Sequence, residues 1–170
     1  ERTWESFLAS RGIAFLDDLV IDPSDYLTQV GSMKGSPVFP ILDYGGAEIL
    51  LPLKTRRFDT VFFTARSLAI DSGDASKILL LTGTQSMGLS SEVKPGTRLT
   101  FTPGRDRKGP LPVGVLIPSG RARIAAFGDS DFLRNPLIEV SGHRDFAVGV
   151  LRELAGKKVV FLLDKMYVDY

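Results

Sequence analysis

Two carboxylates flank a hydroxyl at the end of segment 124–131, IAAFGDSD, where Asp129, Ser130 and Asp131 follow a glycine. The only histidine of the chain, His143, lies a short distance downstream. Serine, histidine and an acidic residue are the groups of a nucleophilic hydrolase, in which histidine takes the proton of serine and the acid orients histidine. The same residue types also suit the polar end of a buried strand, where they satisfy backbone amides.

The hydrolase interpretation takes Gly128, Asp129 and Ser130 as the Gly-Asp-Ser nucleophile motif of esterases with a flavodoxin-like fold. In that group the motif lies near the N-terminus, and an Asp-x-x-His pair lies near the C-terminus. Here the motif lies in the last third of the chain, and Val140 occupies the position three residues before His143. A motif outside its usual context is weak support for an activity. A structural turn is therefore favoured over an active site.

A second interpretation uses Asp129 and Asp131 as an acidic pair for Mg²⁺ and phosphoryl transfer, since hard divalent cations prefer carboxylate ligands. Gly128 separates the apolar run from the first aspartate, and Asp164 stands alone further along the chain. The chain also has no cysteine, which excludes disulfides, thiolate metal sites and a cysteine nucleophile. We therefore expect neither a metal site nor a cofactor.

A third interpretation makes Arg105, Arg107 and Lys108, together with Arg56 and Arg57, a patch for anionic ligands. Charged residues at a loop tip more often keep a surface soluble than bind a ligand. The sequence therefore favours a solvated loop. In the same way, a lone histidine near a helix start is more often a cap or a hydrogen-bonded residue than a catalytic base.

The composition is that of a globular protein, with 44% hydrophobic and 24% charged residues among 170. This length suits a single domain, residues 1–170, with a core of its own. The net charge is +1, so the chain lacks the clustered positive charge that nucleic-acid binding requires, and we expect no nucleic-acid partner. The longest apolar runs are far shorter than the ~20 residues of a membrane-spanning helix.

The first third of the chain predicts short elements. Helical spacing of apolar residues between Thr3 and Gly12 predicts an amphipathic helix that ends at the glycine. Segment 15–25 predicts a strand that breaks at Pro23, because proline has no amide hydrogen for a ladder. Glycine and proline are frequent in segment 26–53, which predicts an irregular excursion with one short helix.

The middle of the chain predicts four strands. Segments 60–70 and 76–84 are rich in apolar and β-branched residues. Segments 97–104 and 111–118 predict a hairpin, joined by the basic, mobile tip 104–110.

The last third predicts a strand, a helix and a strand. Segment 121–127 is almost continuously apolar, which is typical of buried strands in parallel sheets. Segment 143–156 places apolar residues on one helical stripe and ends at Gly156. Segment 157–164 predicts a further buried strand. Together they predict a right-handed βαβ unit.

Residues 108–156, KGPLPVGVLIPSGRARIAAFGDSDFLRNPLIEVSGHRDFAVGVLRELAG, resemble the extracytoplasmic domain of the gliding-motility-type auxiliary proteins of ABC transporters. That family shows a Lys-Gly-Pro-x-x-Val strand, a strand ending in Gly-Asp-Ser-Asp-Phe, and a helix closing in Trp-Leu-Ala-Gly. Residues 7–23, FLASRGIAFLDDLVIDP, and 62–70, FFTARSLAI, resemble earlier segments of the same family in the same order. The chain departs from the pattern at His143, where Asn is usual, and at Glu153, where Trp is usual.

The resemblance implies a fold similar to the class I glutamine amidotransferases, in a descendant that binds rather than catalyses, since the enzymes of that superfamily use a cysteine that this chain lacks. The family domain usually begins upstream of what is Glu1 here, so the chain is expected to be the later part of a larger domain. The resemblance also implies a bacterial, extracytoplasmic protein, tethered to the membrane in its full-length form. Its partners are then transporter membrane components or other envelope proteins, and a small polar or sugar-like molecule is the candidate ligand.

The fold expected is therefore an α/β three-layer sandwich with a mostly parallel sheet and one antiparallel hairpin. The function expected is a non-catalytic binding or assembly module, with a hydrolase using Ser130 and a ligand-free scaffold as the alternatives. Ligands of open α/β sheets bind at the carboxyl ends of the strands, and a helix start attracts anions. The predicted ligand-binding residues are Asp129, Ser130, Asp131, Asn135, His143 and Arg144.

Overall fold

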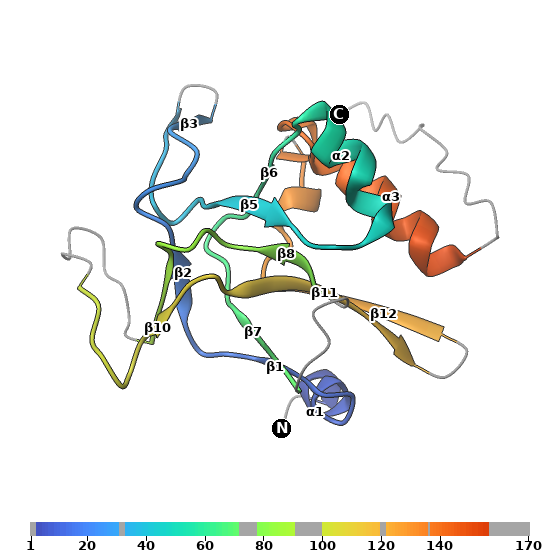
Figure 1. Ribbon diagram of the computed structural model, residues 1–170, viewed down its shortest axis with the longest axis horizontal. Helices are drawn as coiled ribbons and strands as arrows, with labels where there is room; N and C mark the ends of the chain where they lie inside the picture. The colour runs from blue at the N-terminus through green and yellow to red at the C-terminus, as the bar shows by residue number, and fades with distance from the viewer. Residues whose placement is uncertain are drawn as a thin grey trace, which may run out of the picture.

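The computed structural model describes residues 3–30, 33–71, 78–90, 100–119, 122–135 and 137–156. Short strands dominate this part of the chain, and Figure 1 shows them gathered beside two helices that lie together on one side. In chain order the elements are α1 (Thr3–Ala9), β1 (Ile13–Phe15), β2 (Leu19–Ile21), β3 (Gln29–Val30), β4 (Met33–Lys34), β5 (Ile41–Tyr44), η1 (Glu48–Leu50), α2 (Leu51–Arg56), β6 (Thr60–Val61), β7 (Leu68–Ile70), β8 (Ile78–Leu81), β9 (Met87–Leu89), β10 (Arg107–Lys108), β11 (Pro112–Ser119), β12 (Ala122–Phe127), η3 (Asp131–Leu133), η4 (Leu137–Glu139) and α3 (His143–Ala155).

The prediction of a three-layer α/β sandwich with a mostly parallel sheet is wrong, because every strand pairing among the described residues is antiparallel. The largest sheet has the strand order β12-β11-β8-β5-β6 and curls into a half-barrel. The pairing of β11 with β12 begins at Ser119 and Ala122, so only two residues connect the two strands. Such a short connection permits only an antiparallel pair, since a parallel pair needs a crossover of a dozen or more residues.

Strand β12 shows why its sequence resembled a parallel strand. Ala125 and Phe127 pack against one core cluster, while Ile124 and Ala126 pack against the other. Both faces of the strand are thus in apolar contact, which gives the continuous apolar run that is more common in parallel sheets. The apolar run of β12 therefore indicates contact on two faces, which is correct, but it does not indicate whether the strand is parallel or antiparallel to its neighbour.

The hairpin predicted for segments 97–104 and 111–118 is also wrong. Strand β11 pairs with β12 on one side and with β8 on the other, and residues 100–104 form no strand; residues 97–99 lie outside the described part. The tip predicted to be mobile contains β10, which pairs with β9 through Arg107 and Lys108. Strands β8 and β12 therefore fill both places beside β11, one of which the segment 97–104 was expected to take.

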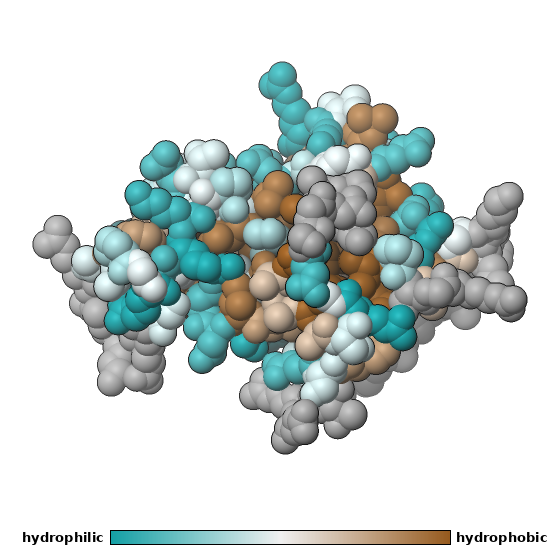
Figure 2. All heavy atoms as spheres, turned by 60° about the horizontal axis from the view of Figure 1, so that its bottom comes forward, coloured by the Kyte–Doolittle hydropathy of each residue, from teal (hydrophilic) through white to brown (hydrophobic). Residues whose placement is uncertain are grey.

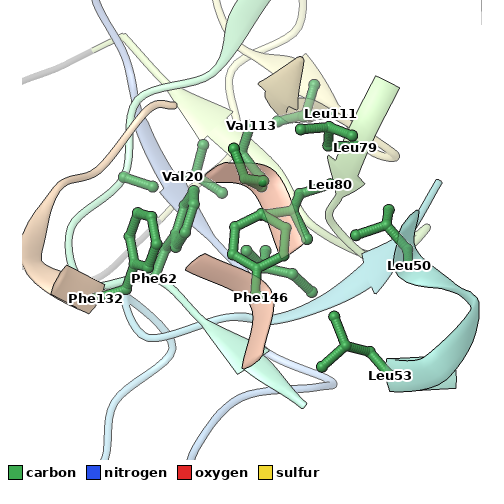
Figure 3. Close-up of a cluster of buried hydrophobic side chains, with 13 residues drawn as sticks. Val20, Leu50, Leu53, Phe62, Leu79, Leu80, Leu111, Val113, Phe132 and Phe146 are labelled. Atoms are coloured by element: carbon green, nitrogen blue, oxygen red, sulfur yellow. The ribbon is translucent and has the colours of Figure 1, made fainter. Parts of the chain in front are cut away.

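The core divides into two clusters, one on each face of β11. The larger lies between the sheet and α2 and α3, and Figure 3 shows Phe62, Phe132 and Phe146 close together in it. The smaller lies between the sheet and α1, β1 and β7. Val113 belongs to the larger cluster and Val115 to the smaller, although alternation would place both on one face. An irregular register at residues 112–115 separates them, as a β-bulge does.

The helices predicted at residues 3–12 and 143–156 are confirmed. Helix α1 is followed by Gly12 with a φ of 75°, and α3 is followed by Gly156 with a φ of 66°, conformations that glycine adopts without steric cost. The strand predicted at 157–164, and with it the βαβ unit, lies outside the described residues. Among the described residues, no helix has the length and apolarity that crossing a membrane requires.

The earlier segments contain more breaks than their sequences indicate. Segment 60–70 forms β6 and β7 with a bend at Thr64, whose φ is 62°. Segment 15–25 has its break at Pro23 as predicted, but two short strands, β1 and β2, precede it. The short helix predicted in the excursion 26–53 corresponds to η1 and to the first residues of α2, which continues past the excursion to Arg56. The excursion also supplies β5 to the main sheet.

Candidate functional site

Asp129 lies just after the end of β12, next to the segment that follows β6. Gly128 permits this approach, since a Cβ at its position would lie 1.8 Å from the backbone oxygen of Arg66. The Asp129 carboxylate accepts two amide hydrogen bonds, from Phe63 to Oδ2 and from Asp131 to Oδ1, both at 2.8 Å. Burial raises the pKa of the Asp129 carboxyl above its ordinary value, while these amides oppose the rise.

His143 is fully buried at the start of α3. Its Nε2 accepts a hydrogen bond from the amide of Val61 at 3.0 Å, and its Nδ1 lies 2.7 Å from the carbonyl oxygen of Leu137. An amide can only donate and a carbonyl can only accept, so the neutral ring carries its proton on Nδ1. Burial lowers the pKa of His143, because desolvation disfavours the imidazolium.

These two side chains bind alternate amides of one strand edge. On its other edge, the segment donates from Phe62 to Pro40 and from Thr64 to Val38. The amides of Val61 and Phe63 therefore point away from β5, toward Asp129 and His143. We call these two side chains and two amides the amide latch. It gives the last strand of the sheet partners that a neighbouring strand would otherwise supply.

The other predicted site residues do not join the amide latch. Ser130 is exposed, and its hydroxyl has no hydrogen-bond partner in the described part of the chain. Asp131 forms an ion pair with Arg134 at 3.0 Å. Asn135 is exposed, and Arg144 is exposed and pairs with Glu139.

The start of α3 is occupied by the chain itself. The amide of Gly142 donates to the oxygen of Asp59, and that of His143 donates to the oxygen of Val140. The imidazole of His143 also fills the space next to the rings of Phe63 and Phe132, with centroids about 6 Å away. The anion site predicted there requires free amides, but the amides of Gly142 and His143 already donate to carbonyl oxygens of the chain.

The basic residues of segment 104–110 are paired with nearby groups. Arg107 lies 3.2 Å from the buried carboxylate of Asp18, and Arg105 lies 3.3 Å from that of Asp106. The Lys108 ammonium lies over the ring of Phe101, 5.4 Å from its centroid. In Figure 1 strand β10 and helix α2 lie on opposite sides of the molecule, so these residues do not form a patch with Arg56 and Arg57.

A cleft of about 350 Å³ lies between α2 and α3, away from the amide latch. Its floor is apolar, and two guanidinium groups, Arg56 and Arg152, line it together with the carboxylate of Asp145. Sequence reasoning considered Arg56 but missed Asp145 and Arg152. Their seven-residue spacing places them on one face of a helix, but only the position of α2 reveals that this face borders a cleft.

Two further clefts are recorded among the described residues. One of about 550 Å³ is lined mainly by hydroxyl, amide and aromatic side chains: Pro23, Ser24, Thr84, Gln85, Ser86, Met87, Phe101 and Lys108. One of about 150 Å³ is an apolar groove between β12, η3 and α3 that includes the exposed Leu133, Leu151 and Leu154. In this part of the chain, no group of three His, Asp or Glu side chains is placed to hold a metal ion.

No family model matches this chain, and no curated protein matches it. The function therefore has to be argued from the residues and geometry of the chain itself.

Proposed function

We propose that this chain is a non-catalytic binding and assembly module of a bacterial ABC-type transport system, on the extracytoplasmic side of the membrane. The amide latch is the observation that carries the non-catalytic part. A serine hydrolase needs a histidine whose nitrogen is open to the serine hydroxyl. Both ring nitrogens of His143, the only histidine, bind backbone groups instead, and Ser130 is exposed on the surface.

The assignment to a transport system is supported by the sequence resemblance of residues 108–156. That resemblance does not extend to the fold that it implied, because the sheet is antiparallel. The support for the assignment is the ordered series of motifs in the sequence, from the Lys-Gly-Pro segment to the helix that ends at Gly156.

Exposed apolar side chains support a role in assembly. Figure 2 shows apolar residues gathered toward the middle of one face, with hydrophilic residues around them. Phe7 on α1 is 48% exposed, and Leu133 beside the apolar groove is 53% exposed. A contiguous exposed apolar patch is typical of surfaces that contact another protein, and Leu133 shares the apolar groove with exposed Leu151 and Leu154.

Photo-crosslinking in cells tests this function. A photoreactive amino acid replaces Phe7 or Leu133 in the full-length protein, and a third variant carries it at Glu48, an exposed polar position that serves as the control. We expect ABC-transporter membrane subunits among the products of Phe7 or Leu133, and none from Glu48. The absence of such subunits at both apolar positions would overturn the transport assignment.

An esterase assay tests the non-catalytic part separately. The purified chain is assayed with p-nitrophenyl esters next to the Ser130→Ala variant. We expect no turnover that depends on Ser130, because both nitrogens of the only histidine bind backbone groups and neither is open to the hydroxyl. Turnover by the wild-type chain that disappears in Ser130→Ala would establish a hydrolase instead.

A further inference from the structure

The arginines in the described part of the chain divide into three groups by their partners. Among the described residues, six have a carboxylate within ion-pair distance: Arg66, Arg105, Arg107, Arg123, Arg134 and Arg144. Arg11 lies over the ring of Phe7 instead. Arg56, Arg57 and Arg152 have neither kind of partner in the described part of the chain, and two of these three, Arg56 and Arg152, line the cleft between α2 and α3.

The floor of this cleft is suited to an apolar group. Ile49 and Leu53 come from the η1–α2 side, Phe58 follows α2, and Val148 lies on α3. Its volume of about 350 Å³ falls within the ~300–1,000 Å³ of small-molecule sites, which combine an apolar lining with a few polar groups. The cleft therefore offers both an apolar surface and unpaired positive charge.

The charges are distributed unevenly along the cleft. Asp145 and Arg152 are seven residues apart on α3, which separates them by about 10 Å along the helix axis at ~1.5 Å per residue. The Cβ of Phe58 would lie 3.0 Å from a Cβ at Gly142, so the end of α2 adjoins the start of α3. Arg56 therefore lies toward the end of the cleft that also holds Asp145, although the two side chains form no ion pair. The opposite end, at Arg152, has a guanidinium without a nearby carboxylate lining the cleft.

We propose that the cleft between α2 and α3 binds a small anionic amphiphile, whose carboxylate or phosphate group meets Arg152 and whose apolar chain lies over Leu53, Phe58 and Val148. Guanidinium binds both anions in a planar, two-point geometry. The apolar chain gains by leaving water. This inference goes beyond the proposed function, because it concerns a small ligand and not the membrane partner.

Gly149 makes the cleft testable without disturbing its walls. A Cβ at this position would meet only the backbone oxygen of Ile49, at 3.7 Å, which is an ordinary contact. Alanine is also favoured over glycine inside a helix by about 1 kcal/mol. Side chains placed here therefore fill the cleft while α3 keeps its structure.

The experiment is calorimetric titration of the full chain with octanoate and octyl phosphate, with inorganic phosphate and uncharged octanamide as controls. We expect saturable binding of the two amphiphilic anions, and binding at least about tenfold weaker for each control, because each lacks one of the two recognised groups. The ratio between octanoate and octyl phosphate distinguishes a carboxylate ligand from a phosphate ligand.

Variants locate the site. Arg152→Gln is expected to weaken octanoate binding about tenfold or more, while Arg134→Gln, which changes an arginine outside the cleft, leaves it unchanged. Asp145→Asn is expected to strengthen binding, since it removes a like charge from the cleft. Gly149→Leu is expected to abolish binding with a melting temperature no lower than that of the wild type, and the smaller Gly149→Ala to weaken binding.

Three results would overturn the proposal. These are no saturable binding of octanoate or octyl phosphate by the wild-type chain, equal binding by Arg152→Gln, and binding that Gly149→Ala and a folded Gly149→Leu leave unchanged. None of them bears on the crosslinks expected from Phe7 and Leu133, which lie outside this cleft, so the transport assignment is tested independently.

Discussion

Mild acid is expected to destabilise this protein through His143. The pKa of the buried imidazole lies below its ordinary value of 6.5, so the unfolded chain binds a proton more readily than the folded one. The neutral ring stabilises the fold fully above pH 6.5. That contribution is lost as the pH falls from 6.5 toward the lower pKa of the folded state. The loss is at most about 1.4 kcal/mol for each pH unit, the slope for a difference of one bound proton.

The structural cause is the hydrogen bond from the amide of Val61 to Nε2 of His143. A proton on Nε2 would face the amide hydrogen and break this bond. Removing the ring by His143→Ala leaves the buried amide of Val61 and the partly buried carbonyl of Leu137 without their partner. At about 2 kcal/mol for each unsatisfied group, the substitution is expected to cost about 4 kcal/mol.

Urea denaturation between pH 5 and 7.5 measures the effect, with His143→Gln as the matched variant. Glutamine can accept from Val61 and donate to Leu137, yet it does not titrate. We expect the free energy of unfolding to fall with acid in the wild-type chain more steeply than in His143→Gln. Asp129 and Asp25 have raised pKa values, so protonation stabilises their folded form as the pH falls. They do so equally in both proteins, and the difference isolates His143.

Equal pH dependence in the wild-type chain and His143→Gln would refute this reasoning. A second readout is proton NMR, in which the single histidine gives one Hε1 signal. A titration midpoint of 6.5 or above for that signal would show that the ring is not held neutral by burial.

Two further substitutions probe the same region by denaturation. Gly128→Ala is expected to destabilise the fold by about 3 kcal/mol, because the new Cβ meets the backbone of Arg66, whereas Gly46→Ala, with open space around it, stays within about 0.5 kcal/mol of the wild type. Asp129→Asn is expected to cost about 2 kcal/mol, because its amide group faces an amide donor, and Ser130→Ala to change stability by less than about 0.5 kcal/mol. Equal losses within either pair would contradict the contacts described for Gly128 and Asp129.

Local patterns in the sequence were sufficient for the elements whose partners lie nearby in the chain. Helix α3 has an apolar stripe and a terminal glycine within one segment, and its prediction was confirmed from His143 to Ala155. The break at Pro23 also follows from a single residue, because proline cannot donate to a ladder. In both cases the energy that decides the structure comes from residues close in sequence.

Sequence reasoning also selected Asp129 and His143 as unusual residues, since carboxylates and imidazoles at strand ends and helix starts need partners. It did not find those partners. Val61 and Phe63 are 66 or more residues away and contribute backbone amides, which carry no signature in their side chains. The amide latch was therefore invisible, although both of its side chains were among the predicted site residues.

By itself, the sequence determined where chain segments are buried, where helices end and which polar residues require partners, because these follow from side-chain chemistry and local backbone preference. Only the tertiary structure decided the direction and order of the strands. An apolar run such as that of β12 satisfies two cores equally well in either direction, and pairing is settled by connections and by distant neighbours such as β8 and β9. The cleft between α2 and α3 likewise exists only because two helices, each ordinary in sequence, leave their arginines on a shared surface.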